Sequence, residues 1–177
     1  MTEQGPSAWL ASIAEIFDDV GVDWTLVGAL AANRYRATPR FTTDVDTMAT
    51  FTPSLVDRLE SAGYTVTVVA DEGEGPHLIR CQRGAEAIDI LIPVVEYQRE
   101  ALRRAGDHVL TPEDVIIHKL IAGRPRDLDD IENLLAVHRR SMNLRRVRAV
   151  VADFAAVLED GERPAILERL LRQAGLG

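Results

Sequence analysis

Apolar and polar positions over the first 95 residues follow two periods, one helical and one extended. In SAWLASIAEIFDDV the apolar side chains recur at helical spacing, at Leu10, Ile13, Ile16 and Phe17. The β-branched run YTVTVV and the alternating stretch AEAIDILIP are typical of strands instead. Together these patterns predict helices at 7–20, 29–36 and 53–60, strands at 24–27, 44–49, 64–69, 77–81 and 87–92, and a loop at 71–76.

After Pro93 the pattern becomes helical throughout. Thr111 and Pro112, followed by two acidic residues, are typical of a helix start, with a capping hydroxyl and a first-turn proline. The helical spacing predicts helices at 96–105, 112–122, 126–138, 143–158 and 163–174. The chain is therefore expected to consist of an α/β core over 1–95 and an all-helical region over 96–177.

Composition narrows the class of protein. Hydrophobic residues make up 46% and charged residues 27% of 177 residues, which is ordinary for a globular protein with a substantial core. No apolar run reaches the length of about 20 residues that a membrane span needs, and the N-terminus lacks the pattern of a signal peptide. Cys81 is alone, so no intrachain disulfide forms. We expect a cytoplasmic protein that does not enter a membrane.

The charge is unevenly distributed. The formal net charge is −8, and residues 111–177, with 11 acidic and 11 basic side chains, contribute none of it. This acidic balance differs from that of most nucleic-acid-binding proteins. A basic cluster within residues 138–148 is either an RNA contact or a solvated face, and its arginines are Arg139, Arg140, Arg145, Arg146 and Arg148. Lys119 is the one lysine among 20 basic residues, which codon bias would also explain.

Three carboxylates indicate a metal site. Asp44 and Asp46 are two apart in an expected strand, so both project from one face, with Cα atoms about 6.5–7 Å apart. Asp89 lies among alternating isoleucines of another expected strand, where a carboxylate is costly unless it is paired or bound to a metal. Oxygen ligands favour Mg²⁺ or Mn²⁺, and two such ions suit phosphoryl or nucleotidyl transfer. Otherwise, Asp44 caps a turn and Asp46 faces solvent.

Two further segments carry groups that suit a phosphate. Gly28 and Ala29 stand where an expected strand gives way to a helix, so their backbone amides could approach phosphate, although such a turn is usually only a turn. Arg40 either neutralises phosphate or pairs with Asp44. The stem of Lys119 borders the apolar face of its expected helix, so its ammonium group needs an anionic partner.

Asp127 and Asp130 are the anionic partners that the next expected helix offers to Lys119. Two interpretations stay open. An ion pair between Lys119 and either aspartate locks two helices together. Alternatively, Lys119 contacts a triphosphate, and Asp127 or Asp130 orients Lys119 or Arg126.

These motifs, in this order, resemble those of the nucleotidyltransferase-fold superfamily. The stretch LVGALAANRYRATPRFTTDVDTMA is similar to its first motif, and Arg40, Thr42, Asp44 and Asp46 match the form found in the AbiEii/MenT-like branch of toxin-type nucleotidyltransferases. AIDILI and PEDVIIHKLIAGRPRDLDDIENLL resemble later motifs, so the resemblance spans residues 24–135. Two positions depart from the pattern: Ala29 replaces a second glycine or serine, and Thr47 replaces an apolar residue.

The resemblance implies a mixed β-sheet core flanked by helices and a metal-dependent enzyme. Such an enzyme moves a nucleoside monophosphate from ATP or another NTP to an acceptor hydroxyl. Asp44 and Asp46 would hold the metals and the NTP, Asp89 would complete the site and help to deprotonate the acceptor, and Lys119 would stabilise phosphate charge, since the related branch uses a lysine and a following aspartate.

The resemblance further implies a toxin of a toxin–antitoxin pair that modifies RNA, at a tRNA 3′ end, and is neutralised by an antitoxin protein. Two other functions stay open. One is an aminoglycoside-type antibiotic nucleotidyltransferase, because an acidic cleft attracts a cationic substrate. The other is a catalytically degenerate binding module of the same fold.

Overall fold

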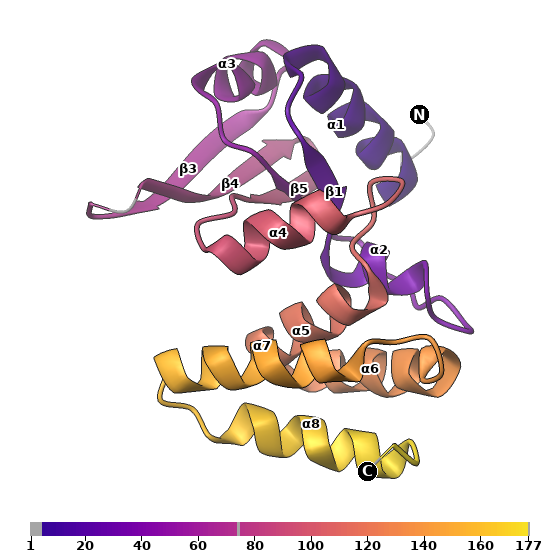
Figure 1. Cartoon of the computed structure of the whole chain (residues 1–177). Coiled ribbons are helices and arrows are strands. Elements are labelled where there is room, and N and C mark those ends of the chain that lie inside the picture. The colour runs from indigo at the N-terminus through magenta and orange to yellow at the C-terminus, as the bar shows by residue number, and fades with distance from the viewer. Residues whose placement is uncertain (1–4, 74, 177) are drawn as a thin grey trace. The chain divides into compact units, whose positions relative to one another are not determined.

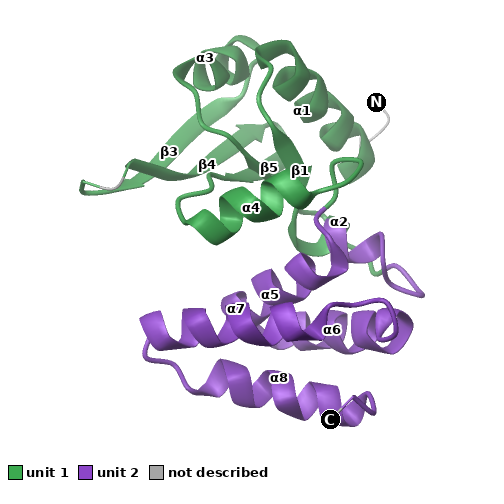
Figure 2. Ribbon diagram, viewed as in Figure 1, with its two compact units in different colours: residues 1–30, 40–109 green, residues 31–39, 110–177 purple. Residues whose placement is uncertain are grey.

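The chain folds into two compact units, seen in the computed structural model (Figures 1 and 2). The structure describes residues 5–73 and 75–176. Unit 1 comprises Met1–Leu30 and Arg40–Val109, and unit 2 comprises Ala31–Pro39 and Leu110–Gly177. The helix α2 (Gly28–Asn33) contains the point where the chain leaves unit 1, since its last three residues belong to unit 2.

Unit 1 is built on one mixed five-stranded sheet. Its strands are β1 (Trp24–Leu26), β2 (Val45–Ala49), β3 (Thr65–Asp71), β4 (Gly75–Arg83) and β5 (Glu86–Leu91). They lie in the order β1-β2-β5-β4-β3, and only β2 and β5 run parallel to each other. Because β2 and β5 are parallel neighbours, the N-terminal ends of the two strands lie side by side, along one edge of the sheet.

One face of the sheet is covered by α1 (Pro6–Val20) and α3 (Pro53–Ser61) (Figure 1). Side chains alternate along β4 and β5, and those that point to the covered face are buried, at Ile79, Cys81, Ile88 and Ile90. The Cys81 thiol is free, and its pKa is raised to about 12, chiefly by burial and further by the charge of Asp89. A third helix of unit 1, α4 (Glu96–Arg104), follows β5.

Unit 2 is helical. Its helices are α5 (Pro112–Ala122), α6 (Pro125–His138), α7 (Leu144–Val157) and α8 (Glu162–Gln173). The α5 helix packs against α6 and α7, and α8 packs on α7. Their shared core is aliphatic, with Ile116, Ile117, Leu134, Val151 and Leu170 buried.

The expected fold class, α/β with helical elements at the C-terminal end, is confirmed, and each expected element is present, most of them with shifted ends. Asp44 lies just before β2 rather than inside it, and the helix expected at 29–36 begins at residue 28 and ends at 33. β3 and β4 extend into the loop expected at 71–76, of which residue 74 is outside the described residues. The compact units place α4 with the sheet, whereas the sequence pattern put a boundary near residue 95. None of the described helices is both long and apolar enough to cross a membrane.

Candidate active site

Two carboxylates lie side by side on the sheet of unit 1. Asp46 of β2 and Asp89 of β5 are register partners in the parallel pair, so their Cα atoms are about 4.8 Å apart and their side chains leave the same face. That face is the one opposite Ile88 and Ile90, and Asp89 is 47% exposed on it. The sheet therefore brings together two of the three carboxylates that the sequence singled out.

Gly28 lies in direct contact with the side chain of Asp46. Its φ is +60°, and a Cβ atom built on it would lie 2.2 Å from Oδ2 of Asp46 and 2.9 Å from its Cβ and Cγ. The backbone N–H of Val27 donates to the Asp46 carbonyl at 3.1 Å, which holds the two segments in this position. The glycine is required here for two reasons, a left-handed backbone and the close approach of the carboxylate.

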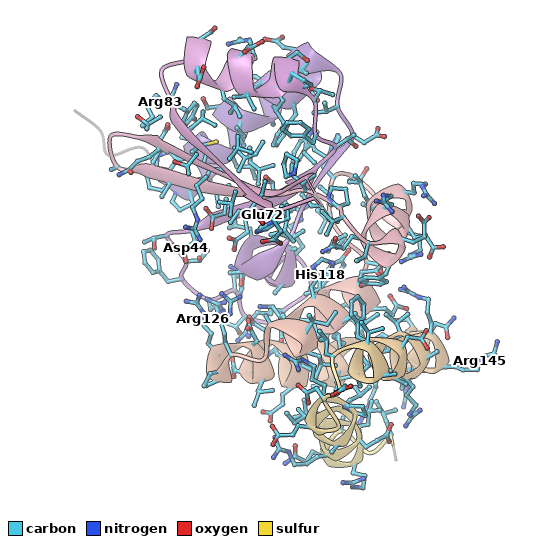
Figure 3. The ribbon with its side chains drawn as sticks, turned by 90° about the vertical axis from the view of Figure 1, so that its left-hand side faces the viewer. Asp44, Glu72, Arg83, His118, Arg126 and Arg145 are labelled. Carbon is cyan, nitrogen blue, oxygen red and sulfur yellow. The ribbon has the colours of Figure 1, made fainter. Side chains whose placement is uncertain are left out.

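Asp44 is the exposed end of the segment that leads into β2 (Figure 3). Its backbone N–H donates to Thr42 Oγ1 at 3.3 Å, and its Oδ1 accepts from Thr43 Oγ1 at 3.2 Å. These contacts match the turn-capping interpretation of Asp44 and also fix Thr42 beside it. Asp44 and Asp46 are nevertheless two residues apart in the sequence, at the edge of the sheet where β2 and β5 begin.

The donor chemistry of this edge suits a hard divalent cation, because all three side chains offer carboxylate oxygen. Among residues 5–73 and 75–176, however, no three His, Cys, Asp or Glu side chains are gathered closely enough to form a metal-binding group. Asp46 and Asp89 fit as neighbouring ligands, and Asp44 is turned to Thr43. Of the other phosphate candidates in unit 1, Ala29 is 7% exposed and Arg40 is half-buried.

Lys119 lies in a buried charge network within unit 2. Its Nζ is 3.0 Å from Asp127 Oδ1 and 2.6 Å from Asp130 Oδ2, and the lysine side chain is 4% exposed. Both aspartates are almost fully buried. The ion pair that locks α5 to α6 is therefore present, and it involves both aspartates.

Two arginines complete this network, and the sequence analysis did not identify either. Arg36 Nη1 is 2.6 Å from Asp130 and 2.8 Å from Asp129, and Arg124 Nε is 2.8 Å from Asp127. Burial raises the pKa of Asp127, but hydrogen bonds from Arg124 and Lys119 outweigh it, so the pKa lies below its usual value. No local spacing predicts the Arg36 contact, because it joins segments more than 90 residues apart.

The arginines of the basic cluster separate into two groups. Arg146 Nη1 donates to the fully buried Asp114 at 2.7 Å, next to the Thr111 cap of α5, and Arg148 pairs with Glu168. Arg145 projects away from the ribbon (Figure 3). Arg139 and Arg140 are also exposed. Arg126, the basic residue of the α6 start, is likewise exposed.

The fold is that of nucleotidyltransferases. The sequence matches no protein-family model and no curated protein. Solved structures do match. The antibiotic-resistance factor ANT(2″)-Ia aligns with 93% of this chain and 96% of its own, at 16% identity and a TM-score of 0.60.

Two further solved structures share the fold. JHP933 from Helicobacter pylori is 18% identical over 95% of this chain and 89% of its own, with a TM-score of 0.54. The lincosamide antibiotic adenylyltransferase LnuA, in its lincomycin-bound structure, is 16% identical over 73% of this chain and 96% of its own, with a TM-score of 0.52. At these identities the likeness establishes the fold and leaves substrate and site residues to be argued from this chain.

Proposed function

We propose that this chain is a metal-dependent nucleotidyltransferase that moves a nucleoside monophosphate from an NTP to an acceptor hydroxyl. The observation that carries this proposal is the pairing of Asp46 with Asp89 on one sheet face, with Gly28 directly behind Asp46. A half-exposed carboxylate pair at the edge of a sheet contributes little to stability, and it is a suitable arrangement for a cation and a phosphate.

Each candidate site residue of unit 1 has a role in this proposal. Asp44, Asp46 and Asp89 hold Mg²⁺ or Mn²⁺, which when bound neutralises phosphate charge and favours ionisation of the acceptor hydroxyl. Asp89 also accepts the acceptor proton. The phosphates of the NTP are bound by the remaining groups of this edge, which are Gly28, the amide of Ala29, Arg40 and Thr42. Such chemistry needs mainly positioning and charge neutralisation.

The basic residues of the proposal, Lys119 and Arg126, belong to unit 2, and the sequence motifs alone assign them to the phosphates. Lys119 stabilises phosphate charge, with Asp127 and Asp130 fixing the position of its ammonium group, and Arg126 assists from the exposed start of α6. The ion pairs of Lys119 support the positioning part of this role. They also make a purely structural role a real alternative, which the stability measurement in the Discussion separates from a role in binding.

For the acceptor we propose RNA, at a tRNA 3′ end, with the protein acting as the toxin of a toxin–antitoxin pair. The motifs around Arg40, Thr42 and Lys119 support this choice. A second candidate is an antibiotic acceptor, because ANT(2″)-Ia is an antibiotic-resistance factor and LnuA is a lincosamide antibiotic adenylyltransferase. A net charge of −8 also favours a cationic substrate. The third candidate is a degenerate binding module.

The test is incubation of the full chain with each labelled NTP and Mg²⁺, in parallel with tRNA, protein and an aminoglycoside as acceptors. We expect label on tRNA, and its loss in Asp46→Asn and Asp89→Asn. Asp57→Asn, on the exposed side of α3, is the control and should leave labelling unchanged. Label on the aminoglycoside alone would move the function to the second candidate. If no acceptor is labelled and NTP binding does not depend on Asp46, the chain is not a nucleotidyltransferase.

The toxin role has its own test in cells. Expression of the chain should arrest growth, co-expression of the neighbouring antitoxin gene should relieve the arrest, and Asp46→Asn should be harmless. Normal growth at a verified level of active protein would contradict the toxin role and leave the enzymatic proposal intact.

A further inference from the structure

The sheet of unit 1 has an open polar face that continues beyond the carboxylates. On β3, β4 and β5, the polar part of the face that carries Asp89 is exposed, and this open face is defined by Thr65, Thr67, Arg80, Gln82, Ala87 and Asp89. The partly buried Val69, Leu78 and Leu91 lie next to it on the same side of the sheet. Alternation explains this arrangement, since the residues between them point to the face covered by α1 and α3. A reactant next to Asp89 would therefore lie on the open face.

Arg80 is the cation of the open face. It is the register partner of Asp89 on β4, and its Nε is 3.9 Å from Asp89 Oδ1. The two side chains are 64% and 47% exposed, and a loose pair in solvent is weak enough to exchange partners. The guanidinium group can bind a phosphate oxygen in the same place, whereas it repels an ammonium group. Arg80 thus favours an anionic reactant over a polycationic one.

Phe41 is an aromatic side chain in the segment that leads to the candidate carboxylates. It lies three residues before Asp44 and is 85% exposed, the highest value among the large hydrophobic residues of the described chain. Single exposed apolar residues are common on proteins, but this one is flanked by Arg40 and Thr42 in the segment that leads into β2. An exposed ring beside a cation is the usual platform for an unpaired nucleobase.

Asp46 and Asp89, the candidate metal ligands, lie beside Arg80, and a bound cation would neutralise part of their charge. The other acidic groups of this sheet region lie at the opposite end of the open face. Asp71 and Glu72 are at the tip of the β3–β4 hairpin, and Asp71 pairs with Gly75, five residues from Arg80 along β4. That separation corresponds to about 15 Å, beyond the Debye length at physiological salt. The end of the open face that carries Arg80 is therefore suited to a phosphate.

We propose that Arg80 and Phe41 select the acceptor: Arg80 binds a backbone phosphate of a single-stranded polynucleotide beside Asp89, and Phe41 stacks on one of its bases. This inference rests on the proposed nucleotidyltransferase function. It adds two residues that determine specificity and a chemical class of acceptor. The base on Phe41 belongs to the acceptor strand rather than to the NTP, and the experiment distinguishes these two sources.

The test compares binding of two probes to the full chain, a short 5′-labelled single-stranded RNA and a fluorescent ATP analogue with Mg²⁺. Arg80→Gln should weaken RNA binding about fivefold and lower the slope of log affinity against log salt by about 0.7. Phe41→Ala should weaken it about tenfold, and Phe41→Tyr, which keeps the ring, should restore it. Arg58→Gln is the matched control, since Arg58 is a part-exposed arginine of α3 that pairs with Asp19 of α1.

ATP affinity should be unchanged in all four variants, and their thermal unfolding should match that of the wild type. Loss of ATP binding in Phe41→Ala, with RNA binding intact, would overturn the assignment of the ring to the acceptor. A wild-type chain that binds ATP but no RNA, or RNA binding that is equal in all four variants, would overturn the proposal while the ATP measurement still supports the enzyme. A wild-type chain that binds no ATP would instead refute the proposed function.

Discussion

Gly28 leaves room for the Asp46 carboxylate because glycine has no Cβ atom. From the sequence, the strand–glycine–helix turn indicated a phosphate contact through backbone amides. The structure shows a different and more local requirement, because a Cβ atom at this position would overlap the Asp46 carboxylate. Sequence reasoning identified the residue, but its contact with Asp46 depends on the β1–β2 pairing, which no local pattern specifies.

Gly28→Ala separates this steric effect from ordinary backbone strain. Both a left-handed backbone and the overlap with Asp46 disfavour alanine, so we expect a loss of about 2–3 kcal/mol in the free energy of unfolding and loss of Mg²⁺-dependent ATP binding. Gly84→Ala is the matched control, since Gly84 has a φ of +61° and nothing within 4 Å of an added Cβ. It should lose about 1 kcal/mol and keep ATP binding. Equal effects in urea unfolding and ATP titration would show that overlap with Asp46 does not matter.

At the scale of the elements, a contact in the site could be predicted from the sequence when it joins two elements that follow each other in the chain. Arg80 was missed although its position was within reach, since β4 and β5 form a hairpin and residues equally far from its turn face each other. Once the turn is placed between Gly84 and Ala85, Arg80 falls opposite Asp89. The Lys119 pair was foreseen because α5 and α6 are adjacent in the chain. Arg36 was not, because its contacts depend on tertiary packing.

Lys119→Met tests what the α5–α6 network contributes. The substitution leaves two buried carboxylates short of one cation, so we expect a loss of about 3–5 kcal/mol in the free energy of unfolding. Asp129→Asn is the control, because Asp129 contacts Arg36 at the surface with 68% of its side chain exposed, and it should cost less than about 1 kcal/mol. Unchanged stability in urea together with lost ATP binding would show that Lys119 serves the phosphates alone.

At the scale of the whole molecule, the pattern of hydrophobic positions predicted the elements and the fold class, but not the division into units. The change from strands to helices near residue 95 placed α4 with the helices, although it belongs to the unit of the sheet. The segment 31–39 joins unit 2 through polar contacts to α6, such as that of the Ala37 N–H with Asn133 Oδ1 at 3.1 Å. Hydrophobic periodicity does not report contacts of this kind.

The stability of the whole chain should fall on mild acidification. Burial lowers the pKa of His118 from 6.5 to about 4, and the charge of Asp114 only partly opposes this. Between these values the unfolded chain binds a proton that the folded chain excludes, so stability is lost as pH falls from 6.5 towards 4. Exclusion of one proton by the folded chain gives an expected slope of up to about 1.4 kcal/mol per pH unit.

Urea unfolding of wild type and His118→Gln at pH 7 and pH 5 measures this slope. The variant, which cannot take up the proton, should lose less stability than the wild type over the same interval. If both lose the same amount, the acid sensitivity arises elsewhere in the chain.

Alkylation of Cys81, the one cysteine of the chain, can report on local opening of the sheet at β4. Cys81 is 2% exposed and its thiolate is suppressed at neutral pH, so an alkylating reagent should modify it only when β4 separates from its neighbours. The labelling rate at neutral pH then measures how often the sheet opens, without any engineered probe. We expect labelling that is far slower than for a free thiol and is slowed further by ATP with Mg²⁺, if the nucleotide stabilises the folded sheet. Labelling as fast as that of a small-molecule thiol would show that this part of the sheet is open in solution.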